Sequence, residues 1–154
     1  MEGPVKVGDN AAGFRLKNNR GKEVHLSDYR GRKVLLSWHP LAWTSVCANQ
    51  MRSLEANCHR FEELNCIAFG LSIDSVPCKN AWAKNLGLAH TDLLSDFWPH
   101  GGVARAYGVF REQDGFSDRA NILLDENQTV AFVKVYPIPQ LPDIEEIMKE
   151  IEKK

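Results

Sequence analysis

The sequence predicts an α/β protein in which helices flank a mixed central sheet. Short apolar runs typical of buried strands alternate along the chain with segments of helical periodicity. The hydrophobic period changes clearly after Pro40, from strand-like to helix-like. At 154 residues, the chain is long enough to bury one substantial core without disulfides or a structural metal. We therefore expect a single domain spanning residues 1–154.

An N-terminal β-hairpin is the first expected element. Residues 13–17 and 23–26 alternate apolar and polar side chains, and residues 18–21 between them have turn composition. Ser27 and Asp28 then favour one short helical turn.

The next two elements are a buried strand and a long helix. Residues 34–38 form a short apolar run that ends before Pro40, as expected of a central strand. Beyond it, apolar side chains recur at steps of four and three, at Cys47, Met51, Leu54, Cys58 and Phe61. This spacing predicts one helix face turned to a core, capped by Thr44 or Ser45 and ending near residue 65.

The second half of the chain repeats this alternation. We expect strands at 66–73 and 93–94, helices at 77–86 and 103–107, an antiparallel hairpin of 120–125 with 129–135, and a C-terminal helix from 143. Gly87 is placed to end the second long helix. This order of elements suits a thioredoxin-like architecture.

Composition excludes several classes of function. Nineteen basic and twenty acidic residues leave a net charge of −1, so a general nucleic-acid binder is not expected. No apolar run approaches the length of a membrane span. Residues 1–6 have no signal-peptide character, and we expect a cytoplasmic protein.

Cys47 is the first candidate functional residue. It lies beyond a buried strand, in the first turn of the long predicted helix, where free N–H groups and the helix dipole stabilise a thiolate. The chain has four cysteines but no C-x-x-C pair. Position alone leaves two interpretations, a reactive thiolate or a small apolar residue on the inner face of the helix.

The residues around Cys47 resemble a known family. Pro40, Thr44 and Cys47, spaced by four and three residues after an apolar strand, resemble the peroxidatic motif of the peroxiredoxins. The resemblance to that family extends to segments 7–16 and 26–31 and to Arg119, an arginine that opens a late strand. Residues 94–110 are similar to its one-cysteine type, called alkyl hydroperoxide reductase E.

The resemblance implies a thioredoxin-fold thiol peroxidase that reduces hydrogen peroxide and organic hydroperoxides through a sulfenic acid on Cys47. It implies that Arg119 and Thr44 hold the peroxide and that Pro40 shields the sulfur. It also implies no metal or organic cofactor, an external thiol or redoxin as reductant, and a homodimer or larger homo-oligomer. The alternative is a redox sensor or holdase that uses Cys47 oxidation as a signal. A disulfide reductase is disfavoured because there is no C-x-x-C.

Three positions depart from the family pattern. His39 stands where an aromatic residue is usual, and Gln50 where a glutamate is common. We expect both to alter polarity at the pocket rim and the dimer contact. Arg52 occupies a place where some members carry a resolving cysteine, so that route is absent.

The other cysteines have separate predictions. Cys58 shares the apolar helix face and Cys66 begins an apolar strand, so both are expected in the core. Cys78, beside Pro77 at a helix start, is expected to be exposed with a lowered pKa, and is a possible resolving cysteine. A zinc site made of Cys58, His59, Cys66 and Cys78 is disfavoured because the spacing lacks a paired knuckle.

Overall fold

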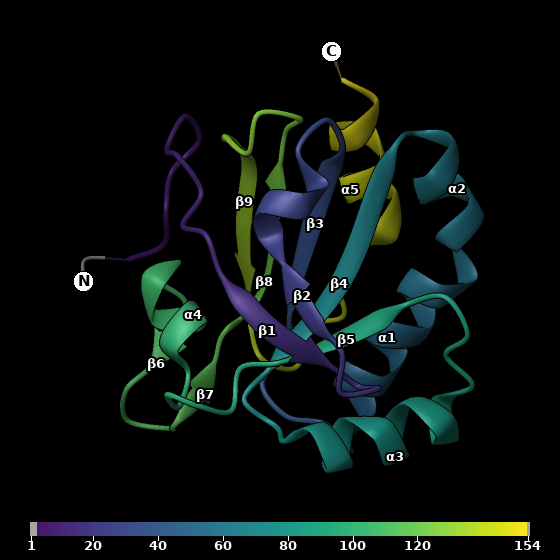
Figure 1. Ribbon diagram of the computed structural model, residues 1–154, viewed down its shortest axis with the longest axis vertical. Helices are drawn as coiled ribbons and strands as arrows, with labels where there is room; N and C mark the ends of the chain where they lie inside the picture. Colours follow the sequence, from purple (N-terminus) through teal and green to yellow (C-terminus); the bar gives the residue numbers. More distant parts are fainter. Residues whose placement is uncertain (1–2, 154) are drawn as a thin grey trace.

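A seven-stranded mixed sheet forms the centre of the molecule in the computed structural model, which describes residues 3–153 (Figure 1). The strands are β1 (Arg15–Asn18), β2 (Glu23–His25), β3 (Lys33–Trp38), β4 (Cys66–Ser72), β5 (Asp92–Ser95), β8 (Arg119–Leu124) and β9 (Val130–Tyr136), in the spatial order β2-β1-β5-β4-β3-β8-β9. The central strand β3 pairs in parallel with β4 and antiparallel with β8. The thioredoxin-like mixed sheet expected from the sequence is confirmed. The first two residues and the last of the predicted domain lie outside the described residues.

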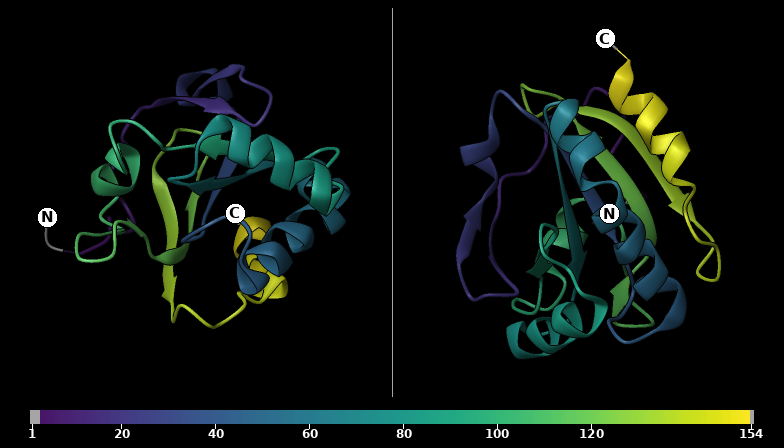
Figure 2. Two further views of the ribbon diagram at one scale, coloured as in Figure 1. Left: turned by 90° about the horizontal axis from the view of Figure 1, so that it is seen from below. Right: turned by 90° about the vertical axis from the view of Figure 1, so that its right-hand side faces the viewer.

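Helices cover both faces of this sheet. They are α1 (Ser45–Ala56), α2 (Cys58–Glu63), α3 (Val76–Leu86), α4 (Gly102–Ala106), α5 (Ile144–Glu152) and a 3-10 turn at Leu26–Tyr29. One core cluster unites side chains of α1, α2, α3 and α5 with Leu35 of β3, and Figure 2 shows α5 beside α1 and α2. The other core cluster contains Val34, Leu36 and Trp38 with side chains of α4. Successive side chains of β3 point to opposite faces of the sheet, and apolar side chains on each face enter a core cluster. The strand is therefore buried on both faces.

The single long helix predicted to end near residue 65 is two helices in the structure, because the helix is interrupted at Asn57. Its side-chain amide donates to the carbonyl of Ser53 at 2.8 Å, and its Oδ1 accepts from Arg60 at 2.9 Å. Such local side-chain bonds compete with helix hydrogen bonding. A separate helix, α2, therefore begins at Cys58.

The loops that follow β3 and β4 are tied together at one end of the sheet. The Asp74 carboxylate, just after β4, accepts a hydrogen bond from the backbone N–H of Ala42 at 2.8 Å and another from Ser72 Oγ at 2.5 Å. These bonds hold the segment between β3 and α1. Beneath that segment, α1 packs so closely on β4 that a Cβ built on Gly70 would lie 2.9 Å from Leu93 and would also overlap Met51.

A two-stranded hairpin, β6 (Phe110–Arg111) with β7 (Phe116–Ser117), has no counterpart among the predicted elements. Two residues per strand are too few to show a period-two pattern. Among the described residues, no helix combines the length and the apolar character needed to cross a membrane.

Candidate active site

Cys47 lies in the first turn of α1, as the sequence predicts, and its side chain is buried. The first N–H to bond within the helix is that of Ala48, which donates to the Thr44 carbonyl at 2.9 Å. The N–H groups of Val46 and Cys47 therefore have no partner within the helix. The start of α1 thus directs N–H donors and the positive end of its dipole toward the sulfur.

Arg119 is the cation beside that sulfur. It opens β8, which pairs with β3, so its side chain comes from the sheet while Cys47 comes from the helix. Its Nη1 donates to Cys47 Sγ at 3.3 Å, and its Nε donates to the Ile138 carbonyl at 2.8 Å. Because Arg119 is also buried, the guanidinium charge acts on the sulfur with little solvent screening.

Gln50 completes this contact and was not among the predicted site residues. Its Oε1 accepts a hydrogen bond from Arg119 Nη1 at 2.7 Å. Its Nε2 donates to Ser37 Oγ at 2.8 Å, which anchors the amide to β3. The sequence had marked Gln50 only as a departure from the family pattern, and its place one helical turn after Cys47 puts it on the same face of α1.

A small cavity of about 240 Å³ lies over this group. Pro40 and Thr44 line it together with Cys47 and Arg119, so the four predicted site residues meet in one place. The Thr44 hydroxyl donates to the Leu41 carbonyl at 2.8 Å, which leaves its lone pairs free to accept. Cys47 is buried beneath this cavity.

His39 lies behind the cavity rather than at its rim, and this corrects the expectation from sequence. It is fully buried, its ring lies 5.3 Å from that of Trp82, and neither ring nitrogen has a hydrogen-bond partner within the described structure. Burial, with the positive charges of Lys79 and Arg119, lowers the pKa of His39 well below its usual value. Gln50 is also buried and likewise does not lie at the rim.

Lys79 of α3 is the second buried base near the site. Its ammonium group has no hydrogen-bond partner among the described residues. Burial lowers the pKa of Lys79 to about 8, although Asp74 and other nearby anionic groups act in the opposite direction. Its position was not anticipated, because lysine at a helical position is normally read as solvated.

The prediction of an exposed Cys78 with a lowered pKa is wrong. Cys78 is partly buried at the start of α3, where its N–H bonds Ser75 Oγ at 3.4 Å. Burial and the Asp74 carboxylate, whose Oδ1 lies 3.9 Å from the sulfur, raise the pKa of the thiol. The side chain of Trp43, in the loop before Cys47, acts on this pKa in the opposite direction. Cys78 thus lies beside this loop but as a protonated thiol.

The remaining two cysteines differ from each other. Cys66 is in the core as expected, and burial raises the pKa of its thiol to about 12. Cys58 is only half-buried, which corrects its assignment to the core, and lines a cavity at the far end of α1. Cys78 does not line that cavity, so the disfavoured set of zinc ligands is not brought together.

A buried cysteine at a helix start, bonded by an arginine from the neighbouring sheet, is typical of a reactive-cysteine site, here carried on a thioredoxin-like fold. The chain belongs to the AhpC/TSA family, whose sequence profile matches residues 7–133. This confirms the resemblance noted in the sequence.

Named relatives and solved structures agree with this assignment. The chain is 37% identical over 132 residues to alkyl hydroperoxide reductase E of Mycobacterium tuberculosis, covering 85% of this chain and 86% of that protein. It is 31% identical to peroxiredoxin 2 of Picrophilus torridus, covering 96% of this chain and 75% of the relative. The reduced 2-Cys peroxiredoxin of Plasmodium vivax superposes with a TM-score of 0.89 at 29% identity, over 97% of this chain and 81% of that one.

Proposed function

We propose that this protein is a thiol-dependent peroxidase that reduces hydrogen peroxide and organic hydroperoxides at Cys47. The observation that carries the proposal is the 3.3 Å hydrogen bond from Arg119 Nη1 to Cys47 Sγ beneath a small cavity. The names of the relatives, alkyl hydroperoxide reductase and peroxiredoxin, support the same reaction.

The reaction follows from the groups around the sulfur. The Cys47 thiolate attacks the terminal oxygen of the hydroperoxide, the O–O bond breaks, and the products are a sulfenic acid and an alkoxide or hydroxide that takes up a proton. Arg119 and the free N–H groups at the start of α1 stabilise the negative charge as it moves from sulfur to the departing oxygen. The lone pairs of Thr44 Oγ1 accept a hydrogen bond from the O–H group of the hydroperoxide, and Pro40 excludes water from the sulfur.

The decisive experiment compares two cysteine variants in peroxide consumption with an added thiol reductant. We expect Cys47→Ser to abolish turnover, because no other thiol is bonded by Arg119. Cys58→Ser is the matched control and should retain turnover, since Cys58 lies at the far end of α1. Equal loss of activity in the two folded variants would refute the assignment of Cys47.

A redox sensor or holdase is the second candidate. The tight enclosure of Cys47 favours neither role by itself, but the two roles differ in recycling. A sensor should consume one equivalent of peroxide and then stop, whereas an enzyme should continue while reductant remains. Intact mass after one equivalent of peroxide separates a stable sulfenic acid from a disulfide.

The reductant that we propose is an external thiol or redoxin, with Cys78 as the alternative internal partner. All four cysteines are free thiols, which is consistent with the reducing cytoplasm that we propose as the location. A homodimer is proposed because large apolar side chains lie at the surface, with Trp43 53% and Trp98 80% exposed. Light scattering of Trp98→Glu should show a smaller particle than the parent protein if this surface holds the subunits together.

A further inference from the structure

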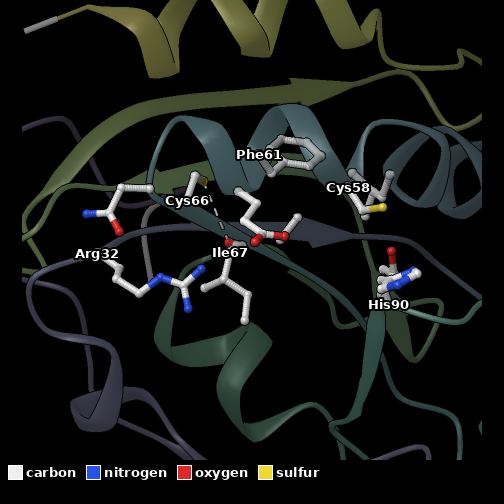
Figure 3. Close-up of a pocket in the computed structure, with 11 residues that line it drawn as sticks. Arg32, Cys58, Phe61, Cys66, Ile67 and His90 are labelled. Carbon is white, nitrogen blue, oxygen red and sulfur yellow. Dashed lines mark hydrogen bonds between the residues drawn. The ribbon is translucent and has the colours of Figure 1, made fainter.

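A second group of metal-ligating side chains lies at the opposite end of α1 from Cys47. Glu55 is in the last turn of α1, Cys58 begins α2, and His90 lies in the loop between α3 and β5. One ligand atom from each of the three lies within 4.8 Å of the others. Cys58 and His90 also line a partly open cavity of about 550 Å³, seen from the side in Figure 3.

The Glu55 carboxylate holds the loop that carries His90. It accepts backbone N–H bonds from Ala89 at 3.0 Å and Thr91 at 2.9 Å, so it holds the loop that carries His90. Its Oε2 lies 3.3 Å from His90 Nδ1. Burial alone would raise the pKa of Glu55, but the backbone N–H groups outweigh it and lower that pKa to about 2.

We propose that Glu55, Cys58 and His90 form a site for a divalent transition-metal ion, with zinc as the ion that fits best. A thiolate, an imidazole and a carboxylate are the three ligand types that zinc takes in proteins. The ligand atoms of a tetrahedral zinc lie about 3.5 Å apart, so the three side chains need to close by about 1 Å. Cys58 and His90 are partly or fully exposed, and such a movement requires no repacking of the core.

The fourth position has a nearby candidate as well. The ring of His59 lies 5.8 Å from that of His90, so a second imidazole is within reach by rotation of an exposed side chain. The break at Asn57 produces this arrangement, because it places Cys58 and His59 at the start of a new helix facing the loop.

The site is separate from the proposed peroxide site. Glu55 lies about 12 Å along α1 from Cys47, and the two cavities share no lining residue. Metal binding here therefore does not depend on the proposed peroxidase function, and either assignment can fail without the other.

The test is metal titration of the full chain carrying Cys47→Ser, which removes the other thiolate. Cobalt(II) added to the metal-free protein should give a sulfur-to-cobalt charge-transfer band, and zinc should displace it stoichiometrically. Cys58→Ala should abolish the band, and His90→Phe should weaken zinc binding by more than about tenfold in competition with a chromophoric chelator. Cys78→Ala is the matched control and should change neither result.

Two results would overturn the proposal. One is the absence of any charge-transfer band in the parent protein. The other is a zinc affinity that stays unchanged in folded Cys58→Ala, since the metal would then be bound elsewhere. Circular dichroism of each variant, measured without metal, establishes that a lost band reflects a lost ligand and not a lost fold.

Discussion

The side-chain amide of Gln50 accepts a hydrogen bond from Arg119 at 2.7 Å, through the same nitrogen that bonds Cys47. Arg119 is therefore aimed at the sulfur by a residue of the helix that carries the sulfur. Because Gln50 is uncharged, it orients the guanidinium without neutralising it, and the full positive charge remains available to the thiolate.

Replacing Gln50 tests this orientation. Gln50→Leu removes the acceptor and should slow the second-order reaction of Cys47 with peroxide by about tenfold, the equivalent of one charge-assisted hydrogen bond. Stopped-flow tryptophan fluorescence measures the rate. Asn49→Leu, an exposed change on the same helix, should react at the parental rate. A parental rate in folded Gln50→Leu would show that Arg119 needs no such support.

Removing the cation itself should have a larger effect. Arg119→Met should lower the rate of peroxide attack by about 10- to 150-fold, because a charged hydrogen bond to the reacting groups contributes about 1.5–3 kcal/mol. The exposed Arg52→Met serves as the control for loss of a positive charge. If Arg119→Met reacts nearly as fast as the parent, Arg119 lies outside the active site.

The buried Lys79 should make the free energy of unfolding depend on pH in the alkaline range. Burial lowers its pKa from 10.5 to about 8, so the unfolded chain holds this proton over a pH range in which the folded protein has lost it. The free energy of unfolding therefore rises as the pH increases from about 8 to 10.5. Below pH 8 the folded protein carries the buried charge, and the full destabilisation by Lys79 applies. Lys79→Met should raise the free energy of unfolding at pH 7 by about 2–3 kcal/mol.

Urea denaturation of parent and variant at several pH values checks this prediction. The difference between the two proteins should shrink steadily above pH 8. The exposed Lys84→Met, on the same helix, should show no such trend. A Lys79→Met protein less stable than the parent at pH 7 would mean that Asp74 and the other nearby anionic groups fully compensate the buried charge.

Recycling provides the fourth prediction. Cys78 is a protonated, partly buried thiol, and a disulfide with Cys47 needs the two Cα atoms within roughly 7 Å. Cys78→Ser should therefore retain most of its turnover with a low-molecular-weight thiol or a redoxin as reductant. A variant that stalls after one turnover, with a Cys47–Cys78 bond in the parent by peptide mapping, would instead establish an internal resolving step.

The sequence was sufficient for the order of the elements and for the main site residues, because both follow from local patterns. Apolar periodicity identified β3 and α1, and the spacing of Pro40, Thr44 and Cys47 identified the loop between them. What it could not show were contacts between distant segments. Cys58 was interpreted as a core residue because the sequence does not show that it lines a cavity together with His90, from a loop 32 positions away. Lys79 drew no prediction, because no local pattern reveals burial against another element.

The absence of a side chain at Gly70 sets how closely the Cys47 helix approaches the sheet. Cys47 comes from that helix and Arg119 from the sheet. The distance between helix and sheet therefore also affects the distance between the Cys47 sulfur and the Arg119 guanidinium. Gly70→Ala would place a methyl group against the side-chain ends of Met51 and Leu93, so these side chains would have to repack beneath α1 while every active-site residue keeps its identity. Laboratory evolution of this enzyme can therefore adjust reactivity from a buried position that touches neither substrate nor sulfur.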